Sequence, residues 1–129
     1  SEREMLEKKI AQLGLQKDFL LLGAVENPYP YYVQTDIYVH ATRFEGKSIA
    51  IQEAQILGCP VIASDCNGNR EQIENGIDGI LCSLTPEAIA DSIKELIADP
   101  KKREKYAKRA RNRNTQNNDE LDLLLNMTK

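Results

Sequence analysis

Four short apolar runs set the strongest limit on how this chain can fold. They cover residues 19–22, 37–40, 61–64 and 79–82, and none of them alternates apolar with polar side chains. Runs of this length are too brief for helices and are typical of strands that are buried on both faces. Segments that carry the sequence signals of helices lie between most of these runs. The pattern therefore predicts an α/β fold, in which flanking helices cover a parallel sheet.

The segments between the runs carry the signals of helix ends. Ser48 is suited to cap a helix, and Gly58 can end that helix in the left-handed conformation. Thr85, followed by a proline, predicts a second helix start. The helices expected along the chain cover residues 2–13, 49–57, 70–73, 86–98, 101–113 and, at the terminus, 119–127.

The chain is long enough for one unit of ordinary size. Its 129 residues leave no room for two full-sized domains. Pro28 and Pro30 block regular structure and favour a turn between the first two runs. Beyond Pro100 the composition changes, since residues 101–113 contain eight Lys or Arg. We therefore divide the chain into an α/β core at 1–99 and C-terminal helices at 100–129.

Charge and composition exclude several classes of function. The formal net charge is −3, so the chain has no overall positive field with which to bind nucleic acid. The basic run could bind an anionic surface, but a solvated helix face is the simpler interpretation. No apolar run reaches the ~18 residues that a membrane span needs, and the first residues do not resemble a signal peptide, which favours a cytoplasmic protein. Three cysteines and one histidine lack the spacing of a zinc site or a disulfide framework, so we expect structural thiols.

One segment combines groups that can bind an anion. Residues 43–53, RFEGKSIAIQE, run from the end of a predicted strand into a predicted helix. Gly46 lets the backbone approach a ligand, and Lys47 adds positive charge. The helix start at residues 48–51 presents unpaired amides and the positive end of the helix dipole. Together these features favour a phosphate or a hydroxyl-rich anion.

Two carboxylates flank this predicted anion site. Glu45 and Glu53 are eight residues apart, which on a helix leaves a residual rotation of roughly 80°, so both can address one ligand. Carboxylates accept hydrogen bonds from the hydroxyls of sugars and ribose. The residues alone equally allow a plainer interpretation, in which Glu45 is a loop residue and Glu53 a solvated helix residue.

Several segments match the motifs of one family in the same order. The matching segments are FLLLGAV at 19–25, TDIYV at 35–39, FEGKSIAIQEA at 44–54, GCPVIASD at 58–65 and NGIDG at 75–79. They resemble retaining GT-B glycosyltransferases of the large family 4, or group 1, type, with Glu45 and Glu53 in the place of its E-x7-E motif. The resemblance covers about residues 2–112.

The resemblance implies a Rossmann-like sheet that forms part of a GT-B C-terminal domain. It implies that Glu45 is the catalytic residue at the donor sugar and that Glu53 accepts hydrogen bonds from the ribose. The backbone of Val25 would read the base. Four backbone amides would lie near the sugar and the diphosphate, those of Gly46, Lys47, Ser48 and Ile49.

The implied function is that of the donor-binding half of a glycosyltransferase. Such an enzyme moves a sugar from a nucleotide diphosphate sugar to an acceptor with retention, in surface polysaccharide or glycolipid synthesis. Its partners would be the nucleotide sugar, the missing N-terminal acceptor domain and, for the full enzyme, a membrane surface. The fragment alone is not expected to be active. No metal or other cofactor is expected, because the chain has no Asp-x-Asp pair.

Two questions stay open at this point. A non-catalytic Rossmann-like module that binds a nucleotide or a protein is the alternative function. The resemblance also implies that two central strands are absent, which would lie between the runs at 19–22 and 37–40. Either these two runs pair directly, or an edge of the sheet is left open.

Overall fold

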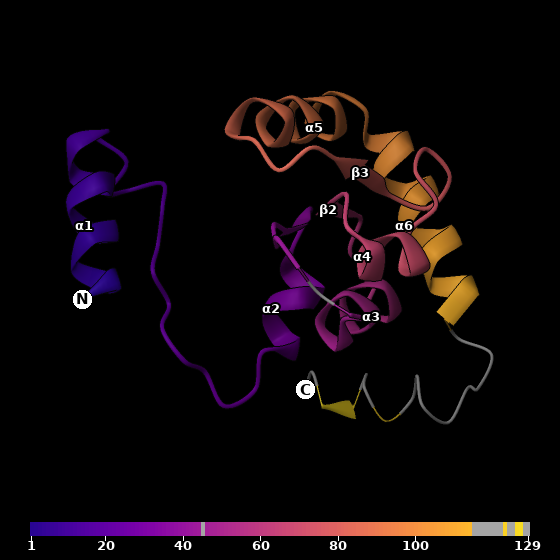
Figure 1. Cartoon of the computed structure of the whole chain (residues 1–129). Coiled ribbons are helices and arrows are strands. Elements are labelled where there is room, and N and C mark those ends of the chain that lie inside the picture. Colours follow the sequence, from indigo (N-terminus) through magenta and orange to yellow (C-terminus); the bar gives the residue numbers. More distant parts are fainter. Residues whose placement is uncertain (45, 115–122, 124–125, 128–129) are drawn as a thin grey trace.

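The structure, a computed structural model, describes residues 1–44, 46–114, 123 and 126–127. Helices and strands alternate along most of this part of the chain (Figure 1). The elements, in order, are α1 (Glu2–Gln12), α2 (Tyr29–Gln34), β1 (Tyr38–His40), α3 (Ile49–Ile56), β2 (Val61–Ser64), α4 (Asn67–Gln72), β3 (Ile80–Cys82), α5 (Pro86–Ala98) and α6 (Pro100–Asn114). The predicted α/β fold is confirmed.

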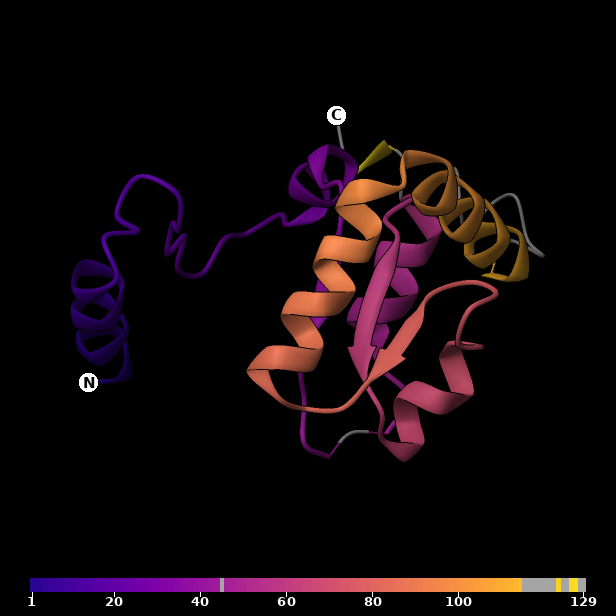
Figure 2. The ribbon, with the colours of Figure 1, turned by 90° about the horizontal axis from the view of Figure 1, so that it is seen from above.

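The three strands form one parallel sheet in the order β1-β2-β3. Ile62 of β2 pairs with Val39 on one side and with Ile80 on the other. Each connection between neighbouring strands passes through a helical segment, as parallel pairing requires. The carboxyl ends of all three strands therefore lie at the same edge, where the arrowheads of β2 and β3 come together in Figure 2.

The core consists of two apolar clusters, one on each face of the sheet. On one face, Val61 and Ala63 of β2 pack with Ile51 and Ala54 of α3. On the other face, Ile62 and Ile80 pack with Leu96 of α5 and Tyr106 of α6. Every residue of β2 is at most 3% exposed. This two-sided burial explains why the run at 61–64 shows no alternation of apolar and polar residues.

The predicted strand at 19–22 is wrong, because these residues form no regular structure. A strand needs a neighbour for its amides and carbonyls. In the described part of the chain, β1 pairs with β2 alone, and the carbonyl of Leu21 instead accepts a hydrogen bond of 3.4 Å from Arg3. Direct pairing of the runs at 19–22 and 37–40 is therefore also wrong. β1 lies at an edge of the sheet.

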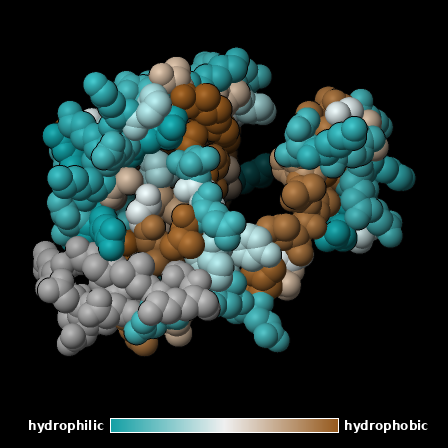
Figure 3. All heavy atoms as spheres, turned by 180° about the vertical axis from the view of Figure 1, so that it is seen from behind, coloured by the Kyte–Doolittle hydropathy of each residue, from teal (hydrophilic) through white to brown (hydrophobic). Residues whose placement is uncertain are grey.

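The predicted N-terminal helix is confirmed as α1, which Ser1 caps by accepting a hydrogen bond from the Glu4 amide at 3.3 Å. Figure 1 shows α1 well apart from the sheet, joined to it by an extended segment. Apolar side chains on α1 and on the segment after it reach the surface (Figure 3). The exposed ones are Met5, Leu6, Leu13, Phe19, Leu20, Leu22 and Val25.

The turn predicted at 27–30 is in fact the start of the short helix α2. Pro30 lies in the first turn of this helix, where a missing N–H costs no hydrogen bond. The side-chain oxygen of Asn27 accepts a hydrogen bond from the Tyr29 amide at 3.1 Å, which helps to fix the entry into the helix. The prolines therefore start a helix here rather than prevent one. α4 likewise begins three residues earlier than predicted, at Asn67.

The basic helix predicted at 101–113 is confirmed as α6, and it packs against both α5 and α3. Tyr106 and Ala110 are its buried residues. Near its end, Arg113 forms an ion pair with Asp78, whose side chain is only 6% exposed. Part of the basic run therefore packs against the core instead of facing only solvent. The helix predicted at 119–127 lies largely outside the described residues.

None of the helices in the described part of the chain is both long enough and apolar enough to span a membrane. The division into a core at 1–99 and helices at 100–129 stays a prediction.

Gly79, directly before β3, lies where the core leaves no room for a side chain. A Cβ atom there would lie 2.9 Å from the carbonyl oxygen of Val61 and 3.0 Å from Cγ2 of Ile73. We therefore expect Gly79→Ala to lower the free energy of unfolding by about 1 to 3 kcal/mol, measured by urea denaturation. Gly46→Ala is the control, because a Cβ atom at Gly46 would meet nothing within 4 Å. Equal stability of the two variants would contradict this packing argument.

Candidate functional site

Residues 41–48 connect the carboxyl end of β1 to α3 and carry most of the predicted site. The predicted cap is confirmed, since the Ser48 hydroxyl accepts a hydrogen bond from the Ile51 amide at 3.2 Å. The first amides of a helix have no partner within it. Those of Ile49 and Ala50 therefore face the end at which an anion would bind.

A glutamine that the sequence analysis missed anchors this loop. The side-chain amide of Gln72 accepts a hydrogen bond from the Ser48 amide and donates one to the Ser48 carbonyl, both at 2.7 Å. Gln55 of α3 donates to the Gln72 carbonyl at 3.0 Å. The Ser48 amide, one of the four predicted to face the donor, thus already has a protein partner. No sequence signal marks Gln72, because its partner is a backbone 24 residues away.

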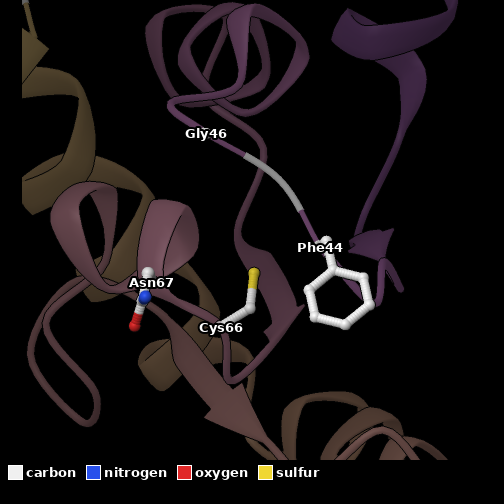
Figure 4. A pocket seen from close by; sticks show the side chains of 4 residues that line it. All are labelled: Phe44, Gly46, Cys66 and Asn67. Atoms are coloured by element: carbon white, nitrogen blue, oxygen red, sulfur yellow. The ribbon is translucent and has the colours of Figure 1, made fainter.

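An open pocket of about 380 Å³ lies between the loop and the start of α4. Phe44 and Gly46 line one side, and Cys66 and Asn67 line the other (Figure 4). In Figure 4 the Cys66 thiol and the Phe44 ring lie on either side of the space between the two segments. The open space above Gly46 agrees with the expectation that a ligand can approach the backbone there.

The structure describes only one of the two carboxylates of the E-x7-E pattern. Glu45 lies outside the described residues, so its assignment as the catalytic residue stays a prediction. Glu53 lies on α3, one turn after the helix start, and is partly buried. Burial raises its pKa, and a hydrogen bond from the Tyr29 hydroxyl partly opposes that rise. Glu53 is therefore neither fully buried nor fully exposed, and its role toward a donor stays a prediction.

Aromatic rings form a row from α2 to the end of β1. Tyr29 stacks on Tyr32 with ring centroids 6.3 Å apart, Tyr32 contacts Tyr38 at 5.5 Å, and Tyr38 contacts His40 at 5.8 Å. The Tyr38 hydroxyl also hydrogen-bonds Nδ1 of His40 at 3.0 Å. Burial and the charge of Glu53 raise the pKa of both Tyr29 and Tyr32. The row therefore ends beside Glu53, an arrangement that the sequence analysis did not predict.

Three other predicted donor-binding residues are exposed. Val25 belongs to the extended segment before α2, and its side chain is exposed. Lys47 is exposed in the loop, and Ile49 is 72% exposed at the helix start. Their roles toward a donor stay predictions.

Asp65 and Cys59 have structural partners. Asp65 forms a surface ion pair with Arg70 at 2.5 Å. The buried Cys59 thiol donates to the Tyr32 carbonyl at 2.9 Å, and burial raises its pKa to about 11. All three cysteines are free, as expected.

The described residues contain no group of three or more His, Cys, Asp or Glu side chains that could hold a metal ion. The expectation that no cofactor is used stays a prediction.

The comparison with known families identifies the chain. A profile described as "Glycosyl transferases group 1" matches residues 1–113. The chain belongs to this family. Among curated relatives, it is 31% identical over 106 residues to an N-acetylgalactosaminyltransferase that acts on a diphospho-undecaprenol in Campylobacter jejuni, and 33% identical over 112 residues to the alpha-D-kanosaminyltransferase of Streptomyces kanamyceticus. It covers 29% of each relative, and these matches cover 81% and 84% of the chain.

Several solved structures share the fold of this chain. HepE from Anabaena, in complex with UDP, superimposes with a TM-score of 0.84 and 26% identity, covering 97% of this chain and 34% of HepE. HepE has also been solved with UDP-glucose. The C-terminal domain of the group 1 protein LpcC from Francisella tularensis gives a TM-score of 0.72 and 34% identity, over 85% of this chain and 58% of that domain. The expected partial GT-B C-terminal domain is confirmed.

Gln72 supplies a direct test of how the loop is held. Gln72→Ala removes both hydrogen bonds to Ser48 and leaves buried backbone groups unpaired. We expect the free energy of unfolding to fall by about 1 to 3 kcal/mol, measured by urea denaturation. Gln12→Ala, at an exposed position of α1, serves as the control and should change the free energy of unfolding by less than about 0.5 kcal/mol. If Gln72→Ala were as stable as the control, another contact would have to hold the loop.

Proposed function

We propose that this chain is the nucleotide-sugar-binding part of a retaining glycosyltransferase of the hexosyltransferase type. The observation that carries the proposal is the partly buried Glu53 carboxylate, one turn below a helix start at the carboxyl edge of a parallel sheet. Such an edge is where α/β sheets bind ligands, and a helix start favours a diphosphate. A carboxylate held beside it accepts hydrogen bonds from ribose hydroxyls.

The donor in this proposal is a nucleotide diphosphate sugar. HepE, a structural neighbour at 26% identity, binds UDP and UDP-glucose. The pocket lined by Phe44, Gly46, Cys66 and Asn67 lies beside the helix start and offers space for the sugar. Glu45, between Phe44 and Gly46 in the sequence, would act on that sugar, and the Val25 backbone would read the base.

The remaining partners follow from the family and are proposals as well. The curated relatives are more than three times as long as the part that this chain matches. We infer an N-terminal acceptor domain that faces the donor site and a role in surface polysaccharide or glycolipid synthesis, with the full enzyme cytoplasmic and peripherally bound to a membrane. This part alone would bind the donor weakly and transfer no sugar.

The two carboxylates should respond differently to removal of their charge. In the full-length enzyme, Glu53→Gln should weaken the nucleoside diphosphate and the nucleotide sugar alike. The expected loss is about 1.5 to 3 kcal/mol, or roughly 10- to 150-fold in affinity, because a charged acceptor is lost from both ribose hydroxyls. Glu45→Gln should impair turnover but leave nucleoside diphosphate affinity nearly unchanged, because it addresses only the sugar.

Both variants are titrated by calorimetry with a nucleoside diphosphate and with a nucleotide sugar. The nucleoside diphosphate is the tightest binder among UDP, GDP and ADP, and the nucleotide sugar carries the same nucleotide. Glu71→Gln, at an exposed position of α4, is the control for loss of a surface charge. Equal losses for both ligands in both variants would refute the division of roles between Glu45 and Glu53.

We also propose that transfer needs no metal ion. The chain has no Asp-x-Asp pair, so backbone amides and side-chain cations would stabilise the leaving diphosphate. The full-length enzyme should therefore keep its rate in excess EDTA. A rate that EDTA abolishes and that added Mg²⁺ or Mn²⁺ restores would overturn this proposal.

A further inference from the structure

We propose that Ser64, the last residue of β2, is a positioning residue that sets the spacing between the two walls of the candidate pocket. The inference rests on the function proposed above, in which this pocket holds the sugar of the donor. Phe44 and Gly46 belong to one wall, and Cys66 and Asn67 belong to the other (Figure 4). Ser64 does not line the pocket, so it acts through the backbone of both walls.

The hydroxyl of Ser64 is bonded to the wall that follows β1. It accepts a hydrogen bond from the Thr42 amide at 2.9 Å and donates one to the Thr42 carbonyl at 2.5 Å. Thr42 lies two residues before Phe44 in the sequence. The two bonds therefore fix the start of the segment that carries Phe44 and Gly46.

The carbonyl of Ser64 is bonded to the wall that follows β2. It accepts hydrogen bonds from the Cys66 amide at 3.0 Å and from Nδ2 of Asn69, in α4, at 2.8 Å. Asn69 is fully buried, and its Nδ2 also donates to the Ser64 hydroxyl at 3.5 Å. These bonds fix the turn that carries Cys66 and leads into α4 at Asn67. One residue thus holds both walls.

Ser64 has no hydrogen-bonding capacity left for a ligand. A hydroxyl offers one donor and two acceptor positions, and the carbonyl of Thr42, its amide and the Asn69 side chain use all three. The residue is also only 3% exposed. A pocket whose walls are fixed before the ligand arrives loses less conformational freedom on binding. Ser64 therefore favours binding of the sugar without touching it.

The contact of Gln72 with Ser48 allows the role of Ser64 to be tested without unfolding the site. Gln72 bonds both the amide and the carbonyl of Ser48, at the other end of the segment that begins at Thr42. Ser64→Ala leaves these bonds in place and releases only the Thr42 end. Ala also fits the space of Ser, so the packing of β2 between its helices is kept.

The test compares Ser64→Ala with Ser92→Ala in the full-length enzyme. Both changes remove a buried hydroxyl, but that of Ser92 donates to the Ala88 carbonyl within its own helix, α5, at 2.8 Å. Calorimetry measures the affinity for a nucleoside diphosphate, the tightest binder among UDP, GDP and ADP, and for a nucleotide sugar with the same nucleotide. Ser64→Ala should weaken the nucleotide sugar roughly 3- to 10-fold more than the nucleoside diphosphate. Ser92→Ala should change each affinity less than about 2-fold.

The difference between the two ligands separates positioning from a general loss of stability. A loss in Ser64→Ala that is equal for both ligands, or no loss for either, would overturn the inference. Ser64→Thr provides the rescue, because Thr keeps the hydroxyl and suits a strand. It should restore most of the lost affinity for the nucleotide sugar. A loss as large as that of Ser64→Ala would mean that the hydroxyl does not set the pocket.

A measurement without ligand tests the contact itself. Hydrogen exchange of the Thr42 amide, followed by NMR, should be faster in Ser64→Ala than in the unaltered enzyme and unchanged in Ser92→Ala. Equal exchange rates in all three proteins would overturn the inference and leave the proposed function in place. If instead the unaltered enzyme binds neither the nucleoside diphosphates nor their sugars, the proposed function fails, and this inference falls with it.

Discussion

β2 lies between two layers of helices, with Val61 and Ala63 packed on α3 and Ile62 packed toward α5 and α6. Each fully buried Val or Ile contributes about 1.5 to 3 kcal/mol, so this strand needs cover on both faces. The helices that connect neighbouring strands provide this cover. They also return the chain to the other end of the sheet, so that neighbouring strands run parallel. Parallel strands then bring the loop after β1 and the turn after β2 to one edge. The candidate pocket lies between those two segments.

The sequence predicted those elements whose signals are local. The strands β1, β2 and β3 coincide with apolar runs, and Ser48 and Thr85 cap the helices expected after them. The run at 19–22 was not a strand, because pairing depends on a neighbour and not on apolar composition. Pro30 was interpreted as a breaker of regular structure, although the first turn of a helix tolerates proline.

The same distinction applies to the site. The helix that carries Glu53 was located correctly, because its Ser48 cap is a local signal that can be read from the sequence. Gln72 could not be found in that way, since it acts on a residue 24 positions away along the chain. Its partner is a backbone segment that only the folded chain brings near. Polar contacts of this kind have no periodicity, so no pattern in the sequence predicts them.

The end of α6 is joined to the helix that carries Glu53. Asn114 donates a hydrogen bond to the Gln55 side chain at 2.8 Å, and Gln55 lies two residues beyond Glu53 on α3. Arg113 is meanwhile paired with Asp78, so this end of α6 is tied to two separate parts of the core. These contacts couple the position of the end of α6 to that of α3. A force that displaces the end of α6 must either break these contacts or tilt α3, and with it the carboxylate proposed to bind the ribose.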